Sequence, residues 1–178
     1  MKSTIANEIA NEINVKYGEN AQYILNDYEV SHCIERIERY REQGKKDLEK
    51  FVYEELLERA ENFNNNRLSP ATVEVGDGVT VNLWSDRHAG TVIKKTKCSI
   101  TIQYDTAILS PKFKPEFEIG GFDAHCTNQN EQSYTYERNT DGRVETYRWS
   151  NKRNCYQGGG DGSITVSKGR HEFYDYNF

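Results

Sequence analysis

The spacing of apolar residues changes from a helical period to a strand period near Pro70, and this change limits the folds that are open to the chain. Before Pro70, isoleucines recur at every fourth position in Ile5, Ile9 and Ile13, which is typical of one helix face. After Pro70, short runs of Val, Ile and Thr alternate with polar residues. Helices followed by strands predict an α+β chain, because a parallel sheet needs helical crossovers between its strands.

The first part of the chain predicts about three helices. Gly18 and Gly44 are placed to end the first two, and Asn26 followed by Glu29 has the spacing of a capping box. The predicted helices cover residues 4–17, residues from about 26 to 43, and residues from 45 to about 62. The residues expected to face inward from the third helix are Leu48, Phe51, Val52, Leu56 and Ala60.

The run "NFNNNRLSP" after the third helix breaks the apolar pattern and predicts a linker. We therefore expect a helical domain over residues 1–66 and a β domain over residues 71–178. A chain of 178 residues is long enough to bury a core in this arrangement.

The β domain begins with four short runs that suit a small antiparallel barrel: "TVEV", "VTVNLW", "GTVIKKT" and "SITIQYD". Further along, residues 133–150 predict a hairpin that turns at Asp141 and Gly142, a strong turn pair. The run "GGGDG" at 158–162 predicts another turn. The tail at 171–178 alternates aromatic and polar residues, which favours a closing strand over the alternative of a tail that docks on a partner.

The stretch "VGDGVTV…HAGTVIKKT…ITIQYD" resembles the SH3-like barrels of the KOW and Tudor type. In those barrels a Gly-Asp pair opens the first strand, and a strand that begins Gly-Thr-Val follows the first loop. The resemblance implies a fold that binds protein segments, RNA or DNA through loops and aromatic side chains.

A broader resemblance rests on "FKPEF", "GGFDAHCTNQNEQ", "YTYE", "YRWS" and "GRHEFYDYNF". These runs are similar to a family of small proteins carried by phages, plasmids and other mobile elements of gut Firmicutes. The resemblance implies an accessory protein that inhibits a host defence system by binding. The partner it implies is the RNA-guided nuclease of a type II CRISPR system, which would make the chain an anti-CRISPR protein. It implies no catalytic residues.

The charge and hydropathy of the chain limit the kinds of partner that we expect it to bind. The net charge is −5, and residues 1–70 hold 14 Asp and Glu against 10 Lys and Arg. Neither half of the chain has the basic excess that is typical of proteins that track phosphates. No run approaches the roughly 18–20 apolar residues of a membrane span, and the start lacks the apolar core of a signal peptide. We expect a protein of the host cytoplasm with reduced cysteines.

We interpret Asp86, Arg87 and His88 as a loop that contacts a partner, because neighbours on a turn point in different directions and make a poor catalytic triad. Trp84, just before them, is expected at the edge of the barrel core. Lysines on the following strand leave nucleic acid open as a partner, and glutamates on the second helix either mimic phosphates or are simply solvated. The residues that we expect to contact a partner are Trp84, Asp86, Arg87, His88, Lys94, Lys95, Glu35, Glu38 and Glu42.

His125 and Cys126 are the strongest candidates for chemistry, since a cysteine nucleophile needs a nearby base. This leaves a Cys126-dependent hydrolase as an alternative function, although adjacent residues rarely meet and a buried thiol is expected. A zinc site drawn from His88, His125, Cys126, Cys155 and His171 would lack paired ligands at short spacing. We therefore expect no cofactor, no metal and no enzymatic activity.

Overall fold

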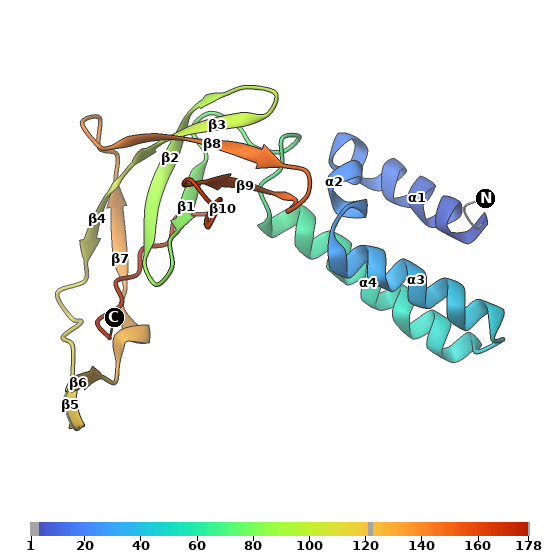
Figure 1. Ribbon diagram of the computed structural model, residues 1–178, viewed down its shortest axis with the longest axis horizontal. Coiled ribbons are helices and arrows are strands. Elements are labelled where there is room, and N and C mark those ends of the chain that lie inside the picture. The colour runs from blue at the N-terminus through green and yellow to red at the C-terminus, as the bar shows by residue number, and fades with distance from the viewer. Residues whose placement is uncertain (1–3, 121–122, 178) are drawn as a thin grey trace. The chain divides into compact units, whose positions relative to one another are not determined.

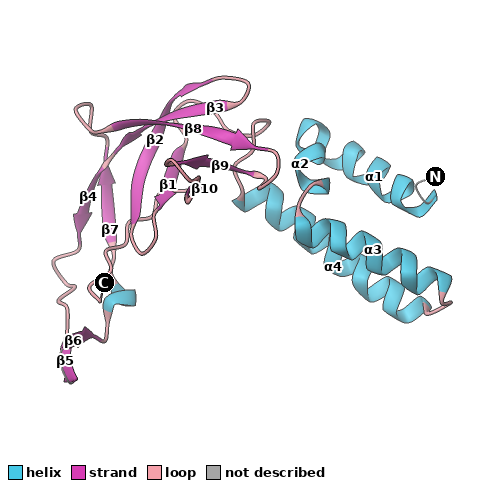
Figure 2. Cartoon of the chain, in the orientation of Figure 1, coloured by secondary structure: helices cyan, strands magenta, loops and turns pink. Residues whose placement is uncertain are grey.

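The computed structural model describes residues 4–120 and 123–177. Helices come first and an antiparallel barrel follows, which confirms the predicted α+β class (Figures 1 and 2). The chain divides into two compact units, a helical unit of Met1–Thr72 with Lys152–Asn154 and a β unit of Val73–Asn151 with Cys155–Phe178. No helix in the described ranges has an apolar stretch long enough to cross a membrane.

The helical unit has three main helices, as predicted, and a short additional turn between the first two. Asp27, rather than the predicted Asn26, caps the second main helix, because its side chain accepts hydrogen bonds from the backbone N–H groups of Glu29 and Val30. Gly44 ends that helix with a φ of +67°, as its position predicted. The helices are α1 (Thr4–Tyr17), η1 (Gly18–Asn20), α2 (Ala21–Leu25), α3 (Tyr28–Glu42) and α4 (Lys46–Asn66).

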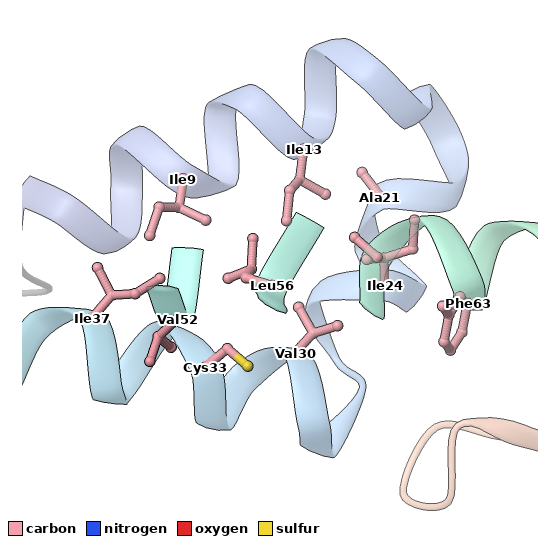
Figure 3. Close-up of a cluster of buried hydrophobic side chains, with 11 residues drawn as sticks. Ile9, Ile13, Ala21, Ile24, Val30, Cys33, Ile37, Val52, Leu56 and Phe63 are labelled. Carbon is pink, nitrogen blue, oxygen red and sulfur yellow. The ribbon is translucent and has the colours of Figure 1, made fainter. Parts of the chain in front are cut away.

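One apolar core joins these helices (Figure 3). On α4, Val52, Leu56 and Ala60 are buried as predicted. The prediction was wrong for Leu48, which is 44% exposed, and for Phe51, which is 62% exposed. Leu48 lies in the first turn of α4 before the core begins, and Phe51 lies about 100° around the helix from the buried stripe. The core residues are Ile9, Ile13, Ala21, Ile24, Val30, Cys33, Ile37, Val52, Leu56, Ala60 and Phe63.

The predicted linker is wrong, because that segment is part of the helical unit. Helix α4 continues to Asn66, and Leu68 and Ser69 beyond it are buried. The Ser69 hydroxyl donates to Asn20 Oδ1 at 2.6 Å, and Asn20 Nδ2 donates to Asn64 Oδ1 at 2.9 Å. These side-chain bonds add to the burial of Phe63 and Leu68 in ordering the segment, whereas its polar composition suggested a loop.

Six strands form a closed antiparallel barrel in the order β1-β10-β9-β8-β3-β2. The turn predicted at "GGGDG" is present between β9 and β10, and Gly159 and Gly162 there have positive φ. The run "TVEV" is not a strand, because Glu74 N–H bonds the side chain of Asp77 in a turn that precedes β1. The barrel strands are β1 (Gly78–Asn82), β2 (Arg87–Lys95), β3 (Ser99–Tyr104), β8 (Val144–Ser150), β9 (Cys155–Gly158) and β10 (Ile164–Lys168).

A two-stranded ribbon extends from the barrel, and a small hairpin lies at its far end (Figure 1). The ribbon pairs β4 (Thr106–Leu109) with β7 (Tyr134–Glu137), and the hairpin pairs β5 (Phe117–Gly120) with β6 (Asp123–Cys126). The short helix η2 (Gln129–Glu131) precedes β7.

The hairpin predicted over residues 133–150 is therefore wrong. Strand β7 pairs with β4 and strand β8 pairs with β3, so the turn at Asp141 and Gly142 interrupts one long ladder instead of reversing it. Gly142 packs against the carbonyl of Tyr104 with no room for a Cβ atom. The turn pair was recognised correctly, but its role depends on strands 30 to 40 residues earlier in the chain.

Asp105 occupies the kink between β3 and β4, and its side chain is fully buried. Its carboxylate accepts hydrogen bonds from Arg138 on the ribbon at 2.7 Å and from Arg170 after β10 at 2.8 Å. The Thr91 hydroxyl of β2 donates to the same carboxylate. Burial opposes its charge, but these hydrogen bonds outweigh burial and lower the pKa of Asp105. One carboxylate thus joins the barrel, the ribbon and the C-terminal tail, residues 170–177.

The difference in burial between Leu56 and Leu48 of α4 can be tested by replacing each with alanine. We expect Leu56→Ala to lower the free energy of unfolding of the helical unit by about 2–5 kcal/mol, because it leaves a cavity in the core. The matched control Leu48→Ala, on the same helix, should cost no more than about 0.5 kcal/mol. Urea unfolding followed by circular dichroism at 222 nm measures both, and equal losses would contradict the assigned core.

Candidate binding surface around Trp84

The loop between β1 and β2 exposes a tryptophan. Trp84 is 89% exposed, and Leu83 N–H donates to the Asp86 carbonyl at 2.9 Å to close the turn. The expectation that Trp84 belongs to the edge of the core is wrong, since Val81 and Ala89 on the flanking strands are the buried residues here. An indole that is left in water on a closed turn is available to a partner.

The predicted loop is shorter than expected, because Arg87 and His88 are the first residues of β2. Arg87 exchanges two backbone hydrogen bonds of 3.0 Å with Phe173, and its guanidinium lies 5.5 Å from the centre of the Phe173 ring. The side chain of Arg87 is therefore held beside the loop by a cation–π contact.

The tail that carries Phe173 is not the closing strand that its alternation predicted, because β10 closes the barrel. Only the isolated bridge between Arg87 and Phe173 is strand-like. The remaining tail bonds use side chains: Asp175 N–H donates to Asp86 Oδ1 at 2.8 Å, and Gln132 bonds both the N–H and the carbonyl of Tyr174. The tail thus fixes the end of the Trp84 loop.

Glu172 in the same tail anchors His88. The His88 Nδ1 atom lies 2.8 Å from Glu172 Oε1, and the other carboxylate oxygen accepts from the Ala89 N–H at 2.7 Å. The hydrogen bond to Glu172 outweighs partial burial and raises the pKa of His88. The nearby carboxylate of Asp86 acts in the same direction, and Arg143 opposes it.

A histidine held by a carboxylate is half of a catalytic dyad, but the other half is absent here. Among the described residues, no serine, threonine or cysteine side chain is hydrogen-bonded to His88, whose ring packs 6.0 Å from that of Tyr104. A general base needs such a partner or a substrate proton within reach. The contact with Glu172 fixes the orientation of the imidazole beside the loop.

The geometry around Cys126 disfavours the hydrolase alternative. Cys126 is buried while His125 is exposed, as expected for neighbours on opposite faces of β6. The backbone N–H and carbonyl of Cys126 are both bonded to the Asn177 amide, so this residue anchors the tail. Within residues 4–120 and 123–177, no group of three His, Cys, Asp or Glu side chains could hold a metal ion.

The structure brings only part of the predicted contact set together. Trp84, Asp86, Arg87 and His88 are neighbours, and this cluster with the tail that supports it is called the Trp84 surface below. Lys94 and Lys95 lie at the other end of β2, about 23 Å away at about 3.3 Å per residue. Lys95 is engaged there, since its Nζ donates to the Val73 carbonyl at 2.6 Å.

The predicted acidic residues Glu35, Glu38 and Glu42 lie on α3 in the helical unit. Glu35 and Glu42 are exposed and Glu38 is partly exposed. Sequence reasoning missed Glu172 and Phe173 as parts of the Trp84 surface. The aromatic and acidic alternation of the tail was the visible pattern, but it was assigned to a strand.

Comparison with known proteins gives no relative from which a role can be transferred: no family model, no curated protein and no solved structure matches the chain.

The contact between His88 and Glu172 predicts a pH-dependent stability. Because folding raises the pKa of His88, its contribution is complete below pH 6.5, the ordinary value, and is lost as the pH rises through the raised pKa. Across this pH range we expect the melting temperature of the wild-type protein to fall by about 2–4 °C more than that of the His88→Asn variant. Asparagine retains an amide donor but does not titrate. Parallel pH curves for the two proteins would show that the pair contributes nothing.

Proposed function

We propose that this chain is a non-catalytic binding protein that acts by binding a partner protein through the Trp84 surface. The observation that carries the proposal is a large aromatic side chain, 89% exposed, on a loop that the tail holds in place. Tryptophan and arginine are the residues most often found at the energetic centre of protein interfaces, and Arg87 lies beside Trp84. A pre-ordered loop also loses little conformational entropy on binding.

Local charge favours a protein partner over a nucleic acid. Three carboxylates lie on the loop and on the tail that supports it, from Asp86, Glu172 and Asp175, against two guanidinium groups, that of Arg87 on the loop and that of Arg143 near His88. Such an excess of negative charge repels phosphates and attracts a basic protein surface. A partner that itself binds nucleic acid has such a surface.

The particular partner that we propose is the RNA-guided nuclease of a type II CRISPR system in a bacterial host. Its support is the resemblance of the β unit to proteins of mobile elements, together with the acidic charge of the chain. In this proposal the protein acts as an anti-CRISPR inhibitor inside the host cell. Each molecule would block one nuclease, because a binder does not turn over.

Direct binding of single-stranded nucleic acid is the second candidate, and the exposed indole of Trp84 favours it, since bases stack on such rings. This candidate predicts affinity that falls steeply with salt. An electrophoretic shift that is strong at about 50 mM salt and weaker but still clear at about 200 mM salt would favour nucleic acid over a protein target.

Replacement of the exposed indole tests the Trp84 surface. We expect Trp84→Ala to weaken binding to a purified, guide-loaded type II nuclease by about 30-fold, the cost of a central hot-spot residue. Tyr28→Ala is the matched control, because Tyr28 is an aromatic residue of the helical unit that is 79% exposed. The Tyr28→Ala variant should bind the nuclease with unchanged affinity.

The same proteins can be titrated in a DNA cleavage assay. Wild-type inhibition should saturate near one equivalent, and Trp84→Ala should require a correspondingly higher concentration. Complete inhibition far below one equivalent would indicate an enzyme. Absence of both binding and inhibition would exclude this nuclease as the partner.

A further inference from the structure

The hairpin β5–β6 has one apolar and one polar face. Because Phe117 pairs with Cys126 and Ile119 pairs with Ala124, these four side chains share a face. Glu118 and His125, which pair between them, lie on the other face.

The C-terminal tail covers the base of this apolar face. The ring of Tyr176 packs 6.2 Å from the ring of Phe117, edge to face. The Asn177 amide accepts from Cys126 N–H at 2.6 Å and donates to the Cys126 carbonyl at 3.1 Å. Cys126 is buried as a result.

The outer half of the same face has no such cover among the described residues. Ile119 is 91% exposed, and Ala124 opposite it is exposed as well. A two-stranded hairpin alone in water is marginally stable. An exposed aliphatic side chain at its end contributes no hydrophobic stabilisation, because its surface stays in water. The outer half is therefore an unpartnered apolar patch that continues a covered one.

Within the described ranges, no residue is hydrogen-bonded to the outer edge of β6 beside that patch. The Cys126 backbone groups point away from β5, since both bond to the Asn177 amide. In an antiparallel pair this orientation recurs at every second residue, so the backbone groups of Ala124 also face outward. The amide of Asn177 already occupies this edge as a neighbouring strand would, and among the described residues none occupies the next position, where another extended segment can bond.

We propose that the outer half of the hairpin binds an extended segment of the partner protein, which adds along the edge of β6 and places apolar side chains on Ile119 and Ala124. This deepens the proposed binding function and rests on it. The segment carries Lys or Arg beside its apolar residues, because residues 116–126 contain three acidic residues and no Lys or Arg.

The same charge argues against the other occupants. A second copy would bring two identical acidic hairpins together, and like charges in direct opposition are destabilising. Phosphates of nucleic acids or of anionic lipids would be repelled by Glu116 and Glu118, which are exposed. The patch is small, so it supplements the Trp84 surface and does not replace it.

Photo-crosslinking tests the assignment directly. Three variants each carry one photoreactive p-benzoylphenylalanine, in place of Ile119, of Trp84 or of Val75. Val75 is the control position, since it lies in the β unit and is 61% exposed. Each protein is irradiated with purified, guide-loaded type II nuclease. We expect the probes at 119 and 84 to cross-link to different nuclease peptides, the former apolar with flanking Lys or Arg, and the control probe to cross-link to none.

Affinity measurements with substitutions complete the test. Ile119→Asp should weaken nuclease binding by about 10-fold, and Val75→Asp should leave it unchanged. A cross-link from position 119 to a second copy, to the guide RNA or to nothing, with position 84 still cross-linked, would overturn the hairpin assignment and leave the Trp84 surface standing. If neither position cross-links and no inhibition occurs, the proposed function and this inference both fail.

Discussion

The β unit depends on one buried carboxylate, that of Asp105. Three parts of the chain that are distant in sequence donate to it: Thr91 on β2, Arg138 after β7 and Arg170 after β10. A buried carboxylate without partners would be costly, but here each donor offsets the loss of hydration. The two arginines stay partly in water, and because one follows the ribbon strand and the other lies in the tail, the shared carboxylate ties both segments to the barrel.

The C-terminal tail connects the Asp105 cluster to the two proposed contact regions. From Arg170 it passes His88 and the Trp84 loop, and it ends at Cys126 on the hairpin. Its attachments along the way are hydrogen bonds that involve side chains, made to other side chains or to backbone groups, with a single strand-like bridge. The Trp84 surface and the hairpin are therefore supported by the same eight residues, 170–177, and both would lose support if these residues detached.

The sequence was sufficient for features that local chemistry determines. The helix boundaries at Gly18 and Gly44 and the inward positions of Val52 and Leu56 follow from period and capping alone. Two of the failures share a cause: the turn at Asp141 and Gly142 and the tail obtain their roles from partners that are distant in sequence. Of the contact set, the residues close together in sequence were found, but Glu172 is joined to them only by folding.

The sequence distance between the tail and its partners has a kinetic consequence. His88 and Glu172 are 84 positions apart, and Asp86 and Asp175 are 89 apart. Closing such long loops is entropically unfavourable until the barrel has brought the ends together, so the tail docks late in folding. During synthesis on the ribosome, the helical unit and the barrel strands are made before residues 170–177. The tail-supported form of the Trp84 loop is thus a late product of chain synthesis, and a nascent chain would expose the indole on a turn that the tail does not yet hold.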